Sequence, residues 1–198
     1  MWFRWGIVIA PMSWRYGWRV HRWHAWLFLG WLSLIGSSCG TQYVTGRRVL
    51  VSGTSKGWVT NPVSNVYLPA CGSRVTLQSR NGSLSEATLP VRLSLGRYRW
   101  AASWLEAYVY VNRAADFNGV VYASRLVLLD NFLGTDGYVV WLDQIQNNGW
   151  NVVKMPLVEF GTLGHPNSSK IVGLSFWLYS NPHRSVSACL GKVIVEGN

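Results

Sequence analysis

The sequence predicts an all-β protein, with one antiparallel β-sandwich or barrel. Short apolar segments rich in Val, Leu, Tyr and Trp recur from about Thr41 onward, and this residue usage is typical of strands. Clusters of Gly, Pro, Asn and Asp, such as "RNGS" at 80–83 and "GTDG" at 134–137, separate these segments and predict turns. No segment has the 3.6-residue apolar repeat of an amphipathic helix.

Nine strands are expected, together with one helical turn at 143–147. Nine strands in about 155 residues suit a single sandwich or barrel domain. The expected strands are residues 48–52, 74–79, 90–95, 104–112, 120–129, 138–142, 151–157, 171–180 and 189–195.

The beginning of the chain differs in composition from the rest. Seven of the thirteen Trp lie before residue 32, and basic residues precede a charge-free segment at 25–35. That segment is shorter than the ~20 residues that a membrane-spanning helix needs. A basic region, a short apolar core and the small residues "GSSCG" are typical of a secretory signal, which starts at Met1 or at Met12. An uncleaved anchor or an interfacial helix is the alternative.

We therefore expect residues 1–39 to be a signal peptide or membrane-anchor segment, and residues 40–198 to be the sandwich domain. A cut after Ser38 would make Cys39 the first residue of the mature protein. This arrangement resembles a bacterial lipoprotein signal, although Gly36 stands where such signals usually have Leu. The resemblance implies lipidation of Cys39 and a membrane partner. Two fates stay open, a lipoprotein on the cell surface and a freely secreted domain.

Two further cysteines, Cys71 and Cys189, lie within the expected domain. A pair of cysteines in an exported domain can form a disulfide. Two buried free thiols, which pack as small apolar side chains, are the alternative.

One predicted strand has large aromatic side chains opposite its core face. Residues 104–112 read "WLEAYVYVN", and alternation gives them an aliphatic face of Leu105, Ala107, Val109 and Val111. The other face carries the aromatic and polar side chains of Trp104, Glu106, Tyr108, Tyr110 and Asn112. Residues 171–180 repeat this design, and their outer face carries Ile171, Gly173, Ser175, Trp177 and Tyr179. We expect the tyrosines of the first strand to be more exposed than its valines, and the two aromatic sets to share one sheet face.

Four roles for these aromatic faces stay open. They are cross-strand packing, contact with a covering loop at 61–69, an interface with another chain, and a sugar-binding platform. A pyranose ring has an apolar C–H face that an aromatic ring covers, and hydroxyl groups that nearby polar side chains bind. Glu106 and Asn112 lie on the same predicted face as the tyrosines, which fits a ligand site with an apolar floor and a few placed polar groups.

Three segments resemble the last third of a jelly-roll, galactose-binding-like carbohydrate-binding module. They are "GWNVVKMPLVEF" (149–160), "KIVGLSFWLYS" (170–180) and "ACLGKVIVEG" (188–197). The segment "WLEAYVYVN" and the "FNGVVYASRLVLLDNFLG" that follows look like the middle strands of the same family, so that the resemblance covers about residues 100–197. It implies a jelly-roll sandwich and a glycan or polysaccharide partner. Many members have an acidic residue in the final strand beside a calcium ion, but Lys192 stands there in this chain, so we expect no metal.

The remaining residues give little support for other functions. Glu106 is the sole acid on the aromatic face of its strand, whereas glycoside hydrolysis usually needs two carboxylates. His165 and His183 lack metal-ligand spacing, and no phosphate loop or nucleophile elbow is found. The formal charge is +10, but the basic residues are scattered, which does not favour nucleic-acid binding. We expect no enzyme activity and no cofactor.

The sequence therefore predicts an exported β-sandwich that binds carbohydrate without cleaving it. Trp104, Tyr108, Tyr110, Trp177 and Tyr179 would supply stacking surface, and Glu106 and Asn112 would bind hydroxyl groups. The alternative is a structural subunit of a cell-surface or extracellular assembly, whose aromatic face packs on a neighbouring chain in a homo-oligomer.

The first testable prediction concerns processing. Because a charge-free segment lies between arginines and small residues, we expect mature protein from the native host to begin at or near Cys39. Intact-mass analysis checks this, and an added diacylglycerol mass would identify lipidation. A mature chain that still holds Arg15 to Arg22 would contradict the prediction.

Overall fold

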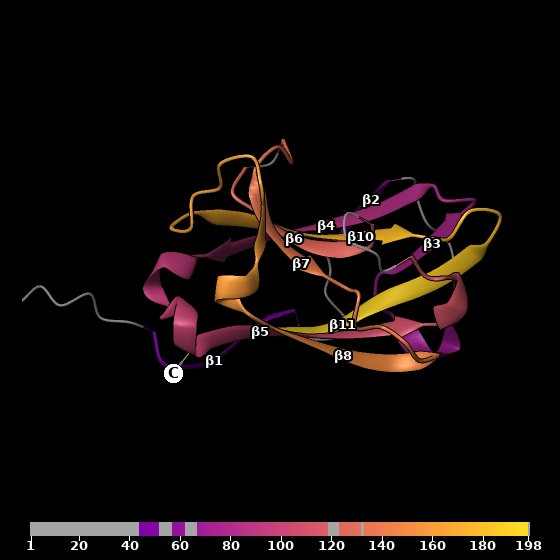
Figure 1. Ribbon diagram of the computed structural model, residues 1–198, viewed down its shortest axis with the longest axis horizontal. Helices are drawn as coiled ribbons and strands as arrows, with labels where there is room; N and C mark the ends of the chain where they lie inside the picture. The colour runs from indigo at the N-terminus through magenta and orange to yellow at the C-terminus, as the bar shows by residue number, and fades with distance from the viewer. Residues whose placement is uncertain (1–43, 52–56, 62–66, 119–122, 132, 198) are drawn as a thin grey trace, which may run out of the picture. The chain divides into compact units, whose positions relative to one another are not determined.

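Strands and short 3-10 turns make up the regular structure in the computed structural model (Figure 1). The structure describes residues 44–51, 57–61, 67–118, 123–131 and 133–197. Across these ranges, eleven strands form two antiparallel sheets that face each other. The predicted all-β antiparallel sandwich is therefore confirmed. The expected signal or anchor at 1–39, with Cys39, lies outside the described residues.

Sheet A is built around the pairing of β5 with β11. Its strand order is β1-β11-β5-β8, and β3 also pairs with β11. The long strand β11 holds two partners along one edge, because β1 pairs with residues 193–197 and β3 with residues 185–189. The strands of sheet A are β1 (Gly46–Val51), β3 (Thr76–Arg80), β5 (Ser103–Val111), β8 (Gly149–Pro156) and β11 (Ser185–Gly197).

Sheet B has the strand order β2-β4-β10-β6-β7-β9. Its two outer strands, β2 and β9, have only three residues each, and short edge strands offer little unpaired backbone to other chains. The strands of sheet B are β2 (Val59–Asn61), β4 (Leu84–Leu93), β6 (Arg125–Leu129), β7 (Gly137–Trp141), β9 (Gly161–Leu163) and β10 (Ile171–Tyr179).

The chain crosses repeatedly from one sheet to the other. It runs from β3 in sheet A to β4 in sheet B and back to β5, then through β6 and β7 to β8, and finally from β10 to β11. In each sheet, strands far apart in sequence become neighbours, as in the pairs β5-β11 and β4-β10. This connectivity is that of a jelly roll, so the jelly-roll form implied by the sequence resemblance is present.

Both sheets direct aliphatic side chains into a shared core. In β5, buried and half-buried residues alternate along the whole strand, as the two-residue period of a strand requires. Val109 and Val111 are 0% exposed, whereas Tyr108 and Tyr110 are half-buried. The predicted difference in exposure between these tyrosines and valines is confirmed.

A bulge changes the alternation at the start of β10. In the pairing with β4, Ile171 lies opposite Leu93, but Gly173 lies opposite Pro90, so β4 has one extra residue there. Ile171 is consequently buried in the core, together with Leu174. The expectation that Ile171 lies on the outer face was wrong, because strict alternation does not continue through a bulge.

Five short 3-10 turns connect the strands in the ranges that the structure describes. In the described part of the chain, no helix has the length and apolar character needed to cross a membrane. The helical turn expected at 143–147 is a tight turn instead, in which Ile145 N–H donates to Leu142 O (3.2 Å). The 3-10 turns are η1 (Pro69–Cys71), η2 (Leu95–Arg97), η3 (Trp100–Ala102), η4 (Ala114–Asp116) and η5 (Leu157–Glu159).

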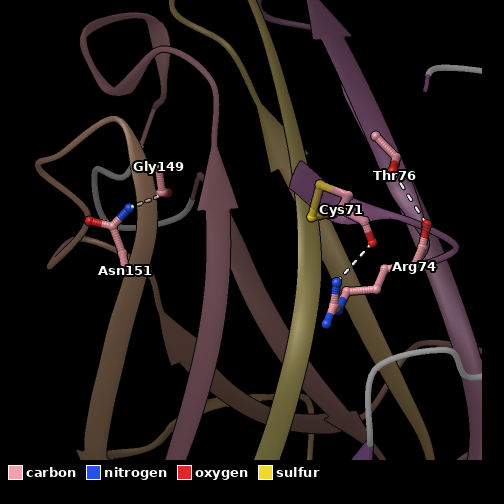
Figure 2. The surroundings of a disulfide bond; sticks show 6 residues. Cys71, Arg74, Thr76, Gly149 and Asn151 are labelled. Atoms are coloured by element: carbon pink, nitrogen blue, oxygen red, sulfur yellow. Dashed lines mark hydrogen bonds between the residues drawn. A yellow bond between two sulfur atoms is a disulfide. The ribbon is translucent and has the colours of Figure 1, made fainter. Parts of the chain in front are cut away.

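A disulfide joins η1 to the middle of β11. Cys71 and Cys189 have a Cα–Cα distance of 6.2 Å and are 118 residues apart in sequence. Figure 2 shows how the segment after Cys71 is held, because Arg74 Nη1 donates to Cys71 O (2.9 Å) and Thr76 Oγ1 donates to Arg74 O (3.3 Å). The predicted Cys71–Cys189 bond is present, and it fits folding in an oxidising compartment.

The second testable prediction concerns this disulfide. Replacing both cysteines, Cys71→Ser with Cys189→Ser, should lower the free energy of unfolding by about 4–5 kcal/mol, because the bond closes a loop of over a hundred residues in the unfolded chain. Urea unfolding measures the loss. In a Cys39→Ser chain, thiol titration under denaturing, non-reducing conditions should find no free thiol, and two free thiols would contradict the bond.

Candidate functional site

The outer face of sheet A gathers aromatic and charged side chains around β5. The register places Tyr110 opposite Trp150 and Glu106 opposite Lys154 on β8. On the other side of β5, Trp104 lies opposite Glu196 on β11, and Arg47 of β1 lies opposite the same Glu196. We call this surface the β5 face; it consists of Arg47, Trp104, Glu106, Tyr108, Tyr110, Trp150, Lys154 and Glu196.

Trp150 is the most exposed aromatic side chain of the β5 face, at 43%. Its ring meets Tyr110 edge to face, with 5.6 Å between the ring centroids. The guanidinium of Arg74 lies 5.2 Å from the centroid of the same ring, within the range of a cation–π contact. Arg74 is itself bound to Cys71 O, so the disulfide region supports one side of the Trp150 ring.

Gly191 gives the Trp150 ring room on the sheet surface. A Cβ at residue 191 would lie 2.8 Å from Cζ3 of Trp150 and 3.2 Å from Tyr108 O, which is closer than ordinary contacts allow. The ring therefore reaches across β5 to β11, at the bulge between Leu190 and Val193. A larger residue at 191 would displace the ring.

Glu106 anchors the polar part of the β5 face. Its Oε1 accepts a hydrogen bond from Tyr108 O–H (2.6 Å) and another from Arg47 Nη2 (3.0 Å). The hydrogen bond to the Glu106 carboxylate raises the pKa of Tyr108 above its ordinary value. Arg47 also approaches Oε2 of Glu196, at 4.0 Å. The two carboxylates of this surface thus share one guanidinium.

Trp104 lies at the far end of the β5 face from Trp150. The ammonium group of Lys154 is 4.2 Å from the Trp104 ring centroid, so a cation covers part of this ring. Along β5, the surface therefore runs from an aromatic pair at Tyr110 and Trp150, through the polar group around Glu106, to the ring and cation of Trp104 and Lys154.

Trp177 and Tyr179 lie on a different surface. They belong to β10 in sheet B, whereas the aromatics of "WLEAYVYVN" belong to β5 in sheet A. Because each set points away from the core of the sandwich, the two sets lie on opposite outer faces. The expectation that they share one sheet face was wrong, since sequence alternation defines the face of a strand but not the sheet it joins.

The Trp177 side chain is integrated into sheet B by polar contacts. Its Nε1–H donates to Ser175 Oγ (2.9 Å), and Ser175 Oγ–H donates to Oε1 of Glu86 (2.7 Å). The guanidinium of Arg125 lies 4.1 Å from the Trp177 ring centroid. These contacts fix the ring and cover part of it.

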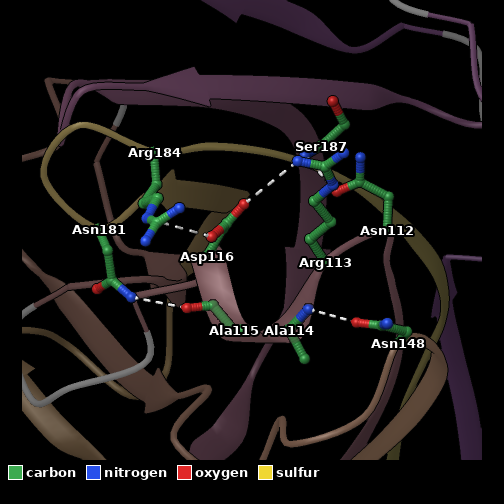
Figure 3. A network of polar contacts seen from close by, with 9 residues as sticks. All are labelled: Asn112, Arg113, Ala114, Ala115, Asp116, Asn148, Asn181, Arg184 and Ser187. Atoms are coloured by element: carbon green, nitrogen blue, oxygen red, sulfur yellow. Dashed lines mark hydrogen bonds and ion pairs between the residues drawn. The ribbon is translucent and has the colours of Figure 1, made fainter.

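Asn112 extends the pairing of β5 with β11 beyond the end of β5. Its N–H donates to Ser187 O (3.0 Å), and its Oδ1 accepts from Ser187 N–H (2.8 Å). Figure 3 shows this pair beside the turn that follows β5. The carbonyl oxygen predicted to bind sugar hydroxyls is thus already engaged with the backbone.

The turn after β5 holds a separate polar network (Figure 3). The buried side chain of Asp116 lies 3.8 Å from both Arg113 Nη1 and Arg184 Nε. The network continues to the neighbouring loops, because Asn181 Nδ2 donates to Ala115 O (3.0 Å). It ties η4 to the loop between β10 and β11 and has a structural role.

Two carboxylates lie on the β5 face, because Glu196 joins Glu106 there, which the sequence did not predict. Both contact the Arg47 guanidinium. Among the described residues, no group of three or more metal-binding side chains is present.

Sequence reasoning missed four members of the β5 face, Arg47, Trp150, Lys154 and Glu196. Trp150 immediately precedes the strand predicted at 151–157, and Lys154 lies within that strand. Because the two residues are four positions apart, the two-residue period of a strand could have placed both on one face. Their position beside Tyr110 and Glu106 depends on which strands pair, and so do the positions of Arg47 and Glu196.

A search of solved structures found likenesses to carbohydrate-binding modules, the class that the sequence resembles. A family 11 module from Clostridium thermocellum, in complex with a β-1,3-1,4-mixed-linked tetrasaccharide, has 10% identity and a TM-score of 0.49; the match covers 78% of this chain and 97% of that one. A family 30 module of a cellulosomal cellulase from the same organism has 12% identity and a TM-score of 0.42, over 80% and 97% of the two chains. The xylan-binding CBM22-1 domain of Xyn10C from Paenibacillus barcinonensis has 13% identity and a TM-score of 0.35, over 77% and 96%.

A scan against protein-family models and a search of curated proteins found no match.

The third testable prediction compares neighbouring residues of β5. Val109→Ala should lower the free energy of unfolding by about 1–3 kcal/mol, because it removes buried methyl groups and leaves a cavity. Tyr108→Ala should cost less, because its ring is half-buried on the outer face. Urea unfolding measures both, with Val59→Ala as the control, since that valine is 69% exposed. A Tyr108→Ala loss as large as that of Val109→Ala would show that the outer aromatics form a second core.

Proposed function

We propose that this protein is an exported, non-catalytic carbohydrate-binding domain, and that the β5 face binds the glycan. The observation that carries the proposal is the Trp150 ring, which is 43% exposed although Gly191, Tyr110 and Arg74 fix its position. A ring held in place before the ligand arrives loses little conformational freedom on binding, which favours affinity.

The polar groups beside this ring complete a surface that suits a sugar chain. A pyranose would place its C–H face on Trp150 or Tyr110. Glu106 lies four residues from Tyr110 along β5, which is about 13 Å in a strand. The hydroxyl groups of a further unit of the same sugar chain would therefore reach Glu106 and Arg47, which offer hydrogen-bond acceptors and donors in one cluster. Exposed aromatic surface with a few placed polar groups is the general pattern of ligand sites.

Trp104, Tyr108 and Lys154 extend the same surface along β5. Oδ1 of Asn112 already accepts a hydrogen bond from Ser187, so the N–H donors of the same side chain would be the groups that bind a sugar hydroxyl. Trp177 and Tyr179 form a second surface on sheet B, and the Trp177→Ala variant described below shows whether glycan binding depends on it.

A protein interface is the second candidate for the β5 face. Two aliphatic side chains of sheet A favour it, because Val49 is 45% and Val152 54% exposed on the same side as Trp150. Aromatic and aliphatic side chains are enriched at the centres of interfaces, so a second copy of this chain could cover them. Sedimentation at several protein concentrations separates the two functions, since a monomer leaves the β5 face free for glycans.

Export of the domain is supported by the disulfide and the N-terminal sequence. The Cys71–Cys189 bond fits an oxidising compartment, and residues 1–39 have the composition of a secretory signal. Lipidation of Cys39 would hold the domain at a membrane surface, whereas cleavage without lipidation would release it.

The fourth testable prediction concerns binding. Trp150→Ala should weaken glycan binding about tenfold or more, because ring stacking worth about 1.4 kcal/mol corresponds to a factor of ten. A screen on a glycan array finds the ligand, and titration calorimetry then measures the variant.

The matched control is Trp177→Ala, which also removes an indole ring, but from sheet B. Thermal unfolding must show that both variants stay folded. Equal loss of affinity in the two variants, or unchanged affinity in Trp150→Ala, would contradict the assignment of the site to the β5 face.

A further inference from the structure

A cavity of about 750 Å³ lies at one end of sheet B, between the end of β4, η2 and the start of β10. Its apolar lining includes Val91, Ile171 and Val172, and its charged lining consists of Arg92, Arg97 and Lys170. The volume falls within the range of about 300–1,000 Å³ that is usual for small-ligand sites. The cavity shares no residue with the β5 face.

The cavity lies beside the bulge in β4. Between the pairs Ile171↔Leu93 and Gly173↔Pro90, two residues of β4, Val91 and Arg92, lie opposite the single residue Val172. Bulges redirect side chains and interrupt pairing, and they are frequent beside binding sites. Pro90 has no N–H to donate, which is tolerated because the pairing of β2 with β4 ends at Thr88.

The wall opposite β4 is the loop before β10, and two aspartates hold it. Asp136 Oδ1 accepts a hydrogen bond from His165 N–H (2.8 Å), and Asp130 Oδ2 accepts one from Asn167 N–H (2.8 Å). The bond from His165 keeps the pKa of Asp136 below its ordinary value, so this anchor stays ionised at neutral pH.

The same loop also meets η2 closely. Gly96 N–H donates to Ser168 O (3.0 Å), and a Cβ at Gly96 would lie 3.2 Å from Ser169 Oγ. The loop and η2 therefore form a continuous end wall for the cavity, built from contacts that do not depend on a ligand.

The charge around the cavity is unbalanced. Its lining holds three cationic side chains and no carboxylate. None of the ion pairs between described residues involves Arg92, Arg97 or Lys170, whereas Arg47, Arg113 and Arg184 elsewhere each contact a carboxylate. Three like charges around one concave surface attract an anion and raise its local concentration.

We propose that this cavity binds an anionic sugar unit, which carries a carboxylate or a sulfate ester. The oxyanion would contact the guanidinium and ammonium groups, for which Arg offers paired N–H donors. The C–H face of the sugar would lie against Val91 and Val172, which are half-buried, with the buried Ile171 behind them. A free inorganic anion would contact only the cationic side chains. It would not fill the cavity and would make no contact with the apolar side chains.

The experiment measures binding of three trisaccharides to the full chain by titration calorimetry. They are a neutral galactose trimer, a galacturonic acid trimer and a sulfated galactose trimer. At least one charged trimer should bind ten times more tightly than the neutral one. Stronger binding of the uronate or of the sulfated trimer identifies which oxyanion the cavity takes.

Two double variants with the same change in net charge test the location. Arg92→Gln with Lys170→Gln should weaken binding of the charged trimer at least tenfold. Arg80→Gln with Lys192→Gln, which lie outside the cavity, should leave the affinity within about twofold. Thermal unfolding confirms that both variants are folded. Equal weakening in the two variants, or no binding of either charged trimer, would overturn the proposal.

Two further measurements distinguish binding in the cavity from binding at the β5 face and from recognition of a lipid headgroup. Trp150→Ala should retain binding of the charged trimer even if it loses neutral glycans, so the failure of one site is distinguishable from the failure of the other. If Trp150→Ala loses binding of the charged trimer while Arg92→Gln with Lys170→Gln keeps it, the assignment to the cavity is overturned. Binding to phosphatidylglycerol vesicles without binding to either charged trimer would assign the cavity to a lipid headgroup and overturn the sugar proposal.

Discussion

The pairing of β5 with β11 is the constraint on which the rest of sheet A depends. It places Val109 opposite Leu190 in the core, and the same register places Trp104 opposite Glu196 on the outside. The bulge in β11 within this pairing contains Gly191, over which the Trp150 ring lies. The disulfide fixes Cys189 of β11 to η1, and η1 positions Arg74 against that ring. The core register, the outer aromatic surface and the disulfide therefore all depend on the position of β11 beside β5.

The two outer faces of the sandwich illustrate different uses of the same side chains. On sheet B, the indole N–H of Trp177 is satisfied by Ser175, and Arg125 lies over its ring, so the aromatic contributes to the stability of the sheet surface. On sheet A, Trp150 is held from below and from its sides while nearly half of its surface stays accessible. The difference lies in the neighbours, since packing and polar contacts decide whether an exposed ring is available to a ligand.

Much of the fold follows from local sequence, and much of the site does not. The alternation in "WLEAYVYVN" predicted which side chains of β5 enter the core, because a strand has a fixed two-residue period. The same reasoning failed at Ile171, where a bulge interrupts the period, and it missed β2 and β9, which are too short to show one. Long-range packing decides which strands become neighbours. Local sequence therefore could not predict that Trp177 and Tyr108 lie on different sheets. For the same reason it could not predict that Arg47 and Glu196 lie beside Glu106.

The central position of β11 also has a consequence for the order in which the domain can form. It is the last of the described strands in sequence, yet β1, β3 and β5 all pair with it. β5 can pair with β8 earlier, but β1 and β3 have β11 as their partner in sheet A, so during synthesis this sheet cannot be completed before residues 185–197 have emerged. Contacts between distant parts of a chain form slowly, because closing the loop between them costs entropy before the contacts contribute any stabilisation. A chain that cannot complete its core early stays unfolded for longer, and the export proposed above would require an unfolded chain.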